Sequence, residues 1–568
     1  MVTTALTPRA ARPLRRQLAA DERLARAGLA GAALWLAVTV AGPLWALLSK
    51  SFLDRDGRFV GLANYAEYLA SPALASSIWH SMGVAVVTTV LVLPAAFLYA
   101  YALTRTSMKA KAVFGAVALV PILAPSLLQA LALVYLFGNQ GLLRDWLLGH
   151  SIYGPLGIVA AEAVYCFPHA LMILTTALAT ADARLYESAA ALGATPRRIF
   201  LTVTVPGAKY GLMSAAFVVF TLVITDFGIP KVIGGQFNVL ATDVYKQVFG
   251  RQNFETGAVV SMILLVPAVL SFLAERYVRL RQQATLTPQA VPLQPRPRPA
   301  VDWTFFGICT LIAVPIVGLL AVAAWGSFVS FWPYNLALGL KNYNFARFET
   351  QGWLPYTNSL RMAGAAALVG TAIVFTTAYL LEKTRGWGPV RVLTQLLAML
   401  PLAVPGLVLG ISYIFFFNHP ANPLGFLYNT LAIMVINTIV HFYTVSHLTA
   451  TTALKQLDAE FEAVSASLRA PFYRTLWAVT VPVCLPAILD IAVYLFVNAM
   501  TTVSAVIFLW APHTRLASIA VVYMDDTGQQ GAAAAMAMMI FYTSAAVKLL
   551  HLLVARGLDR RTQAWRRR

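Results

Sequence analysis

Seven side chains that can take part in chemistry lie within long apolar stretches, where acidic, basic and amide residues are rare. They are Glu162, His169, Asp226, His441, His447, Asp490 and Asn498. An ionisable residue within a membrane-spanning segment is a functional candidate, because placing it in hydrocarbon is costly. These residues show no acid–base or metal-ligand spacing, and neither do Cys166, Cys309 and Cys484. The pattern disfavours an integral-membrane enzyme and predicts no metal site.

Asp226 is the strongest candidate for contact with a transported solute. It follows Thr225 near the expected outer end of an apolar stretch and precedes an expected external segment, Lys231 to Gly257. We predict that Thr225, Asp226 and Asn498 line a substrate path. The alternative is that Asp226 only reaches the outer membrane interface. Three other candidates within the apolar stretches are expected to pair helices: Glu162, His169 and Asp490.

A different motif lies in a polar segment between two apolar stretches, at residues 187–198. It contains Glu187, Ser188, Ala189, Gly193, Arg197 and Arg198. Its alanines favour a short helix, which Asp182 can cap and Gly193 can end in the left-handed conformation. Thr195 and Pro196 suit the cap and first position of a second helix. The small side chains let another protein approach the backbone, and the charged ones offer anchors; an ordinary connecting helix is the alternative.

The apolar stretches that frame these residues are long enough to cross a bilayer. Of the 568 residues, 59% are apolar and 11% are charged, whereas soluble domains have about 45–50% and about 25%. About 20 helical residues span roughly 30 Å of hydrocarbon. We predict an all-α membrane protein of about twelve spans, with the third and ninth partly re-entrant. The expected spans are 27–50, 82–104, 111–137, 152–180, 207–229, 256–275, 302–326, 360–382, 389–417, 425–454, 483–510 and 533–555.

Basic residues lie in short blocks between these spans, so the net charge of +19 does not indicate nucleic-acid binding. One block holds Arg105, Lys109 and Lys111, and another holds Arg276 and Arg279. By the positive-inside rule the blocks are cytoplasmic, which places both termini inside. The first span follows a basic tail and lacks a cleavage pattern, so we expect a retained signal anchor.

The two sets of six spans repeat one another at an offset of 276–280 residues. Gly-Leu-x-Asn-Tyr at 61–65 recurs at 339–343, and Val-Thr-Val-Pro at 203–206 recurs at 479–482. Pro121 and Pro125 likewise recur as Pro401 and Pro405. Because each half has an even number of spans, the repeat is parallel, and the halves can face each other around a central path.

The repeat divides the chain into five parts. These are a basic tail at 1–26, a first half at 27–280, a Pro-rich cytoplasmic linker at 281–301, a second half at 302–556 and a basic tail at 557–568. A Pro-rich linker stays extended and cannot join two helices into one. The second half carries a degenerate copy of the 187–198 motif, with Glu462, Ala463, Ser465 and Arg469. Arg469 replaces the glycine, so Pro471 is expected to make the bend.

The 187–198 motif resembles the EAA loop of ABC importer permeases, with Ser188 in place of the first alanine. The resemblance covers nearly the whole chain and implies a fused, two-half permease with the type I ABC importer fold, multi-pass in the bacterial inner membrane. It also implies that the two loops dock on two ATPase subunits and that a periplasmic solute-binding protein delivers the substrate. The sequence has no Gly-x-x-x-x-Gly-Lys-Ser/Thr phosphate loop, so we expect ATP on the partner subunit and no cofactor on this chain. Membrane lipid is an expected partner, and nucleic acid is not.

Within that family, residues 225–235 and 238–243 look most like the fused permeases for 2-aminoethylphosphonate. Fused permeases for ferric iron, thiamine or polyamines are the alternatives. A gradient-driven carrier of the major facilitator type also has two parallel six-helix halves. That class does not require the structured segment of about 25 residues that follows the fourth span in both halves.

Overall fold

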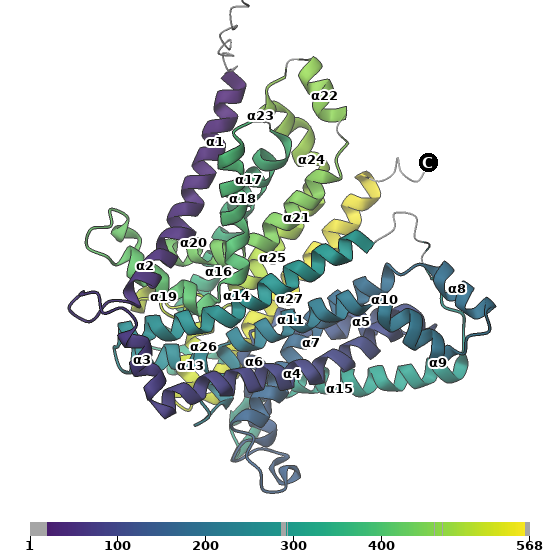
Figure 1. Ribbon diagram of the computed structural model, residues 1–568. Coiled ribbons are helices and arrows are strands. Elements are labelled where there is room, and N and C mark those ends of the chain that lie inside the picture. The colour runs from purple at the N-terminus through teal and green to yellow at the C-terminus, as the bar shows by residue number, and fades with distance from the viewer. Residues whose placement is uncertain are drawn as a thin grey trace, which may run out of the picture.

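The computed structural model describes residues 20–285, 291, 293–384, 386–458, 460–468 and 470–562 and is mostly helical (Figure 1). The first half contains α1 (Ala20–Leu36), α2 (Gly42–Lys50), α3 (Ala63–Ala70), α4 (Pro72–Arg105), α5 (Lys111–Leu119), α6 (Leu127–Phe137), α7 (Pro155–Ala179), α8 (Ala183–Ala191), α9 (Pro196–Ile199), α10 (Val205–Gly207), α11 (Lys209–Thr225), α12 (Gly228–Ile233), α13 (Leu240–Tyr245) and α14 (Phe254–Thr285). The second half contains α15 (Pro299–Phe328), α16 (Leu354–Ala365), α17 (Thr371–Lys383), α18 (Gly388–Met399), α19 (Gly406–Phe417), α20 (Leu431–His441), α21 (Tyr443–Lys455), α22 (Glu460–Ser467), α23 (Phe472–Thr475), α24 (Val481–Val483), α25 (Leu485–Thr501), α26 (Ala517–Asp526) and α27 (Gln530–Thr562). A hairpin of two antiparallel strands, β1 (Val329–Phe331) and β2 (Asn335–Leu338), follows α15. Arg469, most of the N-terminal tail, half of the C-terminal tail and part of the linker lie outside the described residues.

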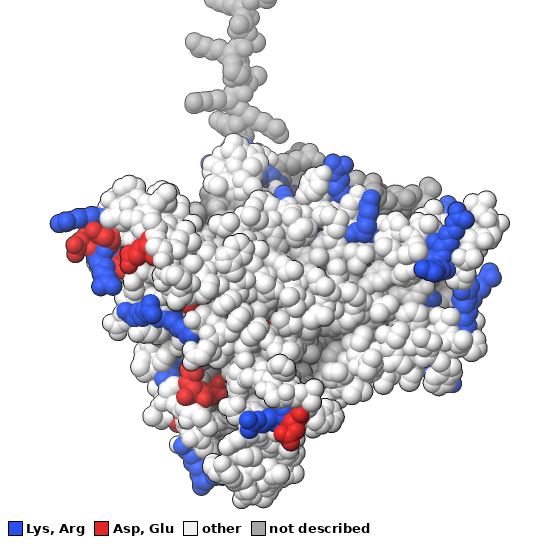
Figure 2. Space-filling model, turned by 60° about the horizontal axis from the view of Figure 1, so that its bottom comes forward, with Lys and Arg blue, Asp and Glu red and all other residues white. Residues whose placement is uncertain are grey.

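Among the described residues, seven helices are long and apolar enough to cross a membrane, and the number rises to twelve, as predicted, if each bent helix pair is counted as one span. Seven are single stretches: Asp21–Lys50, Pro72–Arg105, Pro155–Ala179, Phe254–Arg281, Pro299–Phe328, Leu354–Lys383 and Gln530–Gly557. The other five are helix pairs, each counted as one span, that bend by more than 40° at a short break. Figure 2 shows charged side chains along the edges of a broad uncharged face, as a lipid-facing surface requires.

The third and ninth spans are broken, as the sequence predicts. The helices on either side of the break meet at 100° in the third span and at 118° in the ninth. Pro125 and Pro405 stand just before α6 and α19, and a proline disfavours helix for the residue before it. Bends of 59°, 55° and 79° in the fifth, tenth and eleventh spans were not predicted.

Some predicted boundaries are wrong. α4 begins at Pro72 rather than at 82, α20 begins at Leu431 rather than at 425, and α25 ends at Thr501 rather than at 510. The residues after Thr501 are apolar because they are buried in protein, as Phe508 is. Irregular backbone is tolerated at membrane depth where protein covers it, so apolarity alone cannot separate such a segment from a span.

The halves repeat one another in hydrogen bonding as well as in sequence. Asn64 Nδ2 donates to the backbone oxygen of Ser51, and Asn342 Nδ2 donates to that of Ser327, both at 3.1 Å. The tyrosine that follows each asparagine bonds the hydroxyl of the same serine, at 2.9 and 2.8 Å. The repeated Gly-Leu-x-Asn-Tyr motif therefore ties the chain back to the end of the first span in each half.

The first span of each half packs against the other half (Figure 1). α1 and α2 lie along α17, α18 and α19, whereas α15 lies along α4, α5 and α6. Tyr413 Oη of α19 donates to the backbone oxygen of Thr39 at 2.8 Å. A Cβ added to Gly42 would stand 2.9 Å from Phe416, so glycine allows the close approach of α2 to α19. The halves are thus joined by exchanged first spans.

The expected external segment, Lys231 to Gly257, contains packed helices. α13 is buried from Leu240 to Val244. Ser81 Oγ accepts a hydrogen bond from Leu240 N at 2.8 Å, and in the second half Ser359 Oγ accepts one from Ala517 N at 2.9 Å. These matching contacts make α13 and α26 part of the helical body rather than solvated loops.

Candidate functional site

The 187–198 motif folds as the capping rules predict. Asp182 caps α8, with its Oδ1 accepting from Arg184 N at 3.0 Å. Hydrogen bonds from Arg184 also lower the pKa of this carboxyl. Gly193 ends the helix at φ +75°, and Thr195 Oγ1 caps α9 by accepting from Arg198 N at 3.3 Å, with Pro196 in the first turn. The motif is therefore two short helices joined by a left-handed bend.

This loop presents both charge and apolar surface to its surroundings. Glu187, Ser188, Gly193, Arg197 and Arg198 are exposed, and Ala189 is half-buried. Leu192, which the sequence interpretation passed over, has 87% of its surface exposed. A single exposed leucine is common on protein surfaces, so Leu192 gains meaning only if the second copy of the motif exposes a leucine at the same position.

The second copy of the motif is a similar short helix, α22. Glu462 is half-buried, because its Oε1 lies 2.8 Å from Lys383 Nζ. Ala463 is exposed, and the hydroxyl of half-buried Ser465 is hydrogen-bonded to that of Thr475 on α23.

The two short helices end in the same way. Ala194 N donates to Ala189 O at 3.0 Å, and Ala470 N donates to Ser465 O at 2.9 Å. Each of these hydrogen bonds runs from a backbone N–H to the carbonyl five residues earlier, which is the longer of the two bonds in a Schellman motif. Pro471 then stands at the cap position of α23, in agreement with the predicted bend, and Arg469 itself lies outside the described residues.

Exposed leucines occupy matching positions in the two copies. Leu468 lies 276 residues after Leu192 and has 75% of its surface exposed. The recurrence of a leucine at this position of both copies could have indicated a docking surface from the sequence alone. In Figure 1, the pair α8 and α9 lies well apart from the pair α22 and α23.

The carboxylate of Asp226 is hydrogen-bonded within the protein. Its Oδ1 accepts from Ser126 Oγ at 2.9 Å, and its Oδ2 accepts from Ile229 N at 2.8 Å. It therefore joins the break of the third span to the first turn of α12. Ser126 was not a sequence candidate, because its pairing with Asp226 spans 100 residues.

The other path candidates bond within their own helices. Thr225 Oγ1 donates to Thr221 O, and Asn498 Nδ2 donates to Tyr494 O, both at 2.8 Å. Thr225 and Asp226 are neighbours on the first half, whereas Asn498 belongs to α25 of the second. Asp490 Oδ1 lies 3.2 Å from His551 Nε2 of α27, which agrees with its predicted role in pairing helices.

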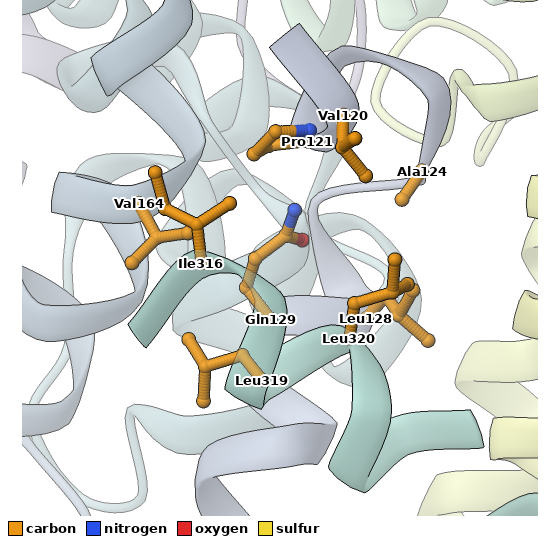
Figure 3. A pocket seen from close by; sticks show the side chains of 9 residues that line it. All are labelled: Val120, Pro121, Ala124, Leu128, Gln129, Val164, Ile316, Leu319 and Leu320. Carbon is orange, nitrogen blue, oxygen red and sulfur yellow. The ribbon is translucent and has the colours of Figure 1, made fainter. Parts of the chain in front are cut away.

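A small pocket lies between the broken third span and α15 (Figure 3). Eight of its nine lining residues are apolar. The ninth residue is Gln129. When its side-chain amide is oriented to make the most hydrogen bonds, the amide nitrogen donates to the backbone oxygens of Pro125 and Ser126 at 3.0 and 2.8 Å. Because its polar side chain is engaged with the backbone, this pocket is a packing feature of the break.

Comparison with known proteins identifies the class. Residues 92–285 match the family described as the binding-protein-dependent transport system inner membrane component. The ferric transport system permease protein FbpB of Actinobacillus pleuropneumoniae is 27% identical over 84% of this chain and 70% of its own length. The chain is an ABC importer permease. A putative ferric transport system permease protein, FbpB 1 of Haemophilus influenzae, is 29% identical over 80% of this permease and 72% of its own length.

The permease is a fused, two-half protein. The similarity to the FbpB proteins runs through both halves, over 491 residues in the first case. By contrast, the spermidine/putrescine transport system permease protein PotB of Haemophilus influenzae matches 41% of this chain and 86% of its own length, at 26% identity. A relative of this kind therefore corresponds to one half. The family assignment and the multiple spans make the chain a multi-pass membrane protein.

Proposed function

We propose that ATPase subunits dock on α8 and α22 and that a periplasmic binding protein delivers the solute at the opposite, outer end. The observation that carries this proposal is the pair of exposed leucines, Leu192 and Leu468, at the same position of the two copies. Around the first of them, Glu187, Arg197 and Arg198 are also exposed. The ATP would be bound by the partner subunits.

Replacing the leucines by aspartate tests the docking surface. Leu192→Asp and Leu468→Asp should each reduce the amount of ATPase subunit that co-purifies with the permease, because a charge would be placed in an apolar contact. Leu148→Asp is the matched control, since Leu148 is also 87% exposed but lies between α6 and α7. Normal co-purification with the double variant would show that these loops are only connectors.

For the solute, we propose 2-aminoethylphosphonate. The support is the resemblance of residues 225–235 and 238–243 to permeases of that group. Asp226 lies within this stretch, and its contacts with Ser126 and Ile229 place it where two broken spans meet. Ferric iron is the second candidate, because the FbpB relatives, which match both halves, are named ferric transport permeases.

Growth of a deletion strain separates the two solutes. If the phosphonate proposal is right, the strain should fail to grow on 2-aminoethylphosphonate as sole phosphorus source and should grow normally on phosphate. Normal growth on the phosphonate together with reduced uptake of ferric iron would decide for the second candidate. Complementation with the intact gene is the control for both outcomes.

A further inference from the structure

One ion pair joins the two halves at their outer ends, opposite α8 and α22. Lys231 lies in α12 of the first half, and Asp526 is the last residue of α26 in the second. Lys231 Nζ lies 2.8 Å from Asp526 Oδ1, although 295 residues separate them in sequence. The contact therefore exists only while the outer ends of the two halves stay together.

Aromatic rings beside this ion pair also cross between the halves. Lys231 Nζ lies 5.3 Å from the centre of the Tyr245 ring. Phe508 of the second half lies 6.4 Å from the Tyr245 ring and 5.6 Å from the Phe249 ring, and it is nearly parallel to the latter. The ion pair thus stands at the edge of an apolar seal between the halves.

The charges at the end of α26 explain why a cation from the other half is favourable there. Asp525 and Asp526 occupy the last two positions of this helix. The dipole of a helix opposes negative charge at its C-terminus, so Lys231 offsets an unfavourable arrangement. At the offset of 277 that matches Leu240 with Ala517, the residues corresponding to Lys231 and Asp526 are Phe508 and Phe249, so the repeat does not duplicate this pair.

We propose that Lys231 and Asp526 form a latch that holds the outer ends of the two halves together and opens when the transporter receives its solute. The side chains are 22% and 44% exposed, and an ion pair of this kind contributes little to folding stability. A small bias is nevertheless sufficient to shift an equilibrium between two conformations. In the described conformation the outer ends are in contact while α8 and α22 lie apart (Figure 1).

Cysteine cross-linking tests the closeness of the latch in the full chain. Lys231→Cys/Asp526→Cys, in lipid nanodiscs with a short bifunctional maleimide that replaces the reach of the lysine side chain, should become cross-linked in most molecules. A protease site inserted at residues 287–289 makes this visible, because the cleaved halves stay together on a non-reducing denaturing gel only when they are cross-linked. The single-cysteine variants should separate. Separation of the double variant as well would overturn the proposal.

Hydrolysis of ATP tests the function of the latch, and this arm rests on the ATPase docking proposed above. Lys231→Gln and Asp526→Asn should each raise the ATPase activity of the assembled transporter without binding protein by up to about fivefold, which corresponds to about 1 kcal/mol for one exposed pair. Lys231→Asp/Asp526→Lys should return it toward the wild-type level. Lys246→Gln is the matched control, because Lys246 bonds Asn238 within its own half. Unchanged activity in both single variants, with the ATPase still bound, would overturn the latch while leaving the docking proposal intact.

Discussion

Lys383 Nζ and Glu462 Oε1 form a 2.8 Å ion pair that joins the end of α17 to α22. At the corresponding positions of the first half, the guanidinium of Arg105 lies over the ring of Tyr186, 4.9 Å from its centre. Each short helix is thus tied to the second span of its own half by a cation, although the partner of that cation differs.

Charge reversal should therefore act differently in the two loops. Glu462→Lys breaks an internal contact, and the double variant Lys383→Glu/Glu462→Lys should recover ATPase co-purification and uptake. The single change should cost about 1 kcal/mol or less, because both side chains retain some exposure, 11% and 30%. Glu187→Lys reverses an exposed charge on the proposed docking face, so it should reduce assembly and transport while the permease remains inserted. A Glu187→Lys variant with full ATPase binding and uptake would remove Glu187 from the interface.

Alanine substitutions at Gly193 and Gly207 should show whether a glycine is needed for its backbone conformation or for the space that a side chain would fill. A Cβ would meet nothing within 4 Å at either Gly193 or Gly207, but only Gly193 has a positive φ, +75°. Gly193→Ala should cost about 1 kcal/mol, and Gly193→Val should cost more, by misdirecting α8. Gly207→Ala should be nearly neutral. ATPase co-purification and thermal unfolding measure the difference, and equal behaviour of the two alanine variants would contradict it. In the second loop, where Arg469 replaces the glycine, Arg469→Ala should be mild.

Asp525 should make stability depend on pH. Burial raises the pKa of this carboxyl from 3.8 to about 7, with a further contribution from Asp526 and an opposing one from Lys231. Tyr135 and Tyr153 are its other ionisable neighbours. Between pH 3.8 and about 7 the folded protein holds a proton that the unfolded chain lacks, so lowering the pH through this window should stabilise the fold. The thermal midpoint of wild type should therefore rise between pH 8 and 5 relative to Asp525→Asn. If the thermal midpoints of wild type and Asp525→Asn changed with pH in the same way, the proposed effect of Asp525 would be contradicted.

Thiol labelling should reveal which end faces the cytoplasm. Leu148 and Leu192 are both 87% exposed, and the three native cysteines are buried. In intact cells, a membrane-impermeant maleimide should label Leu148→Cys and should label Leu192→Cys only after permeabilisation. The reverse pattern would contradict the cytoplasmic placement of α8 and of the termini.

Local rules predicted much of this molecule from its sequence. Asp182, Gly193 and Thr195 adopt the expected conformations because capping and left-handed turns depend on a few neighbouring residues. The spans and the breaks near Pro125 and Pro405 could be predicted for the same reason, because each depends on the residue types within one short stretch of sequence.

The parts that could not be predicted depend on partners far away in the sequence. Tyr413 meets Thr39 across 374 residues, and this contact belongs to an exchange of spans that no local pattern encodes. The hydrogen bond between Asp226 and Ser126 could not be predicted because Ser126 lies in a different span, 100 residues away. Helix α13 was expected to belong to an external segment because it contains polar residues, but Thr242 and Asp243 are hydrogen-bonded within the protein.

The exchanged first span also has a consequence for synthesis. Its partner helices begin at Thr371, about 320 residues after Lys50, and translation at about 5–20 residues per second takes roughly 15–60 s over that distance. Throughout this interval, the helices α17, α18 and α19, which later cover α1 and α2, have not been synthesised. An 18-residue window within Asp21–Lys50 has a mean hydropathy of 1.8, which is apolar enough for this span to remain in the bilayer until its partner helices have been synthesised.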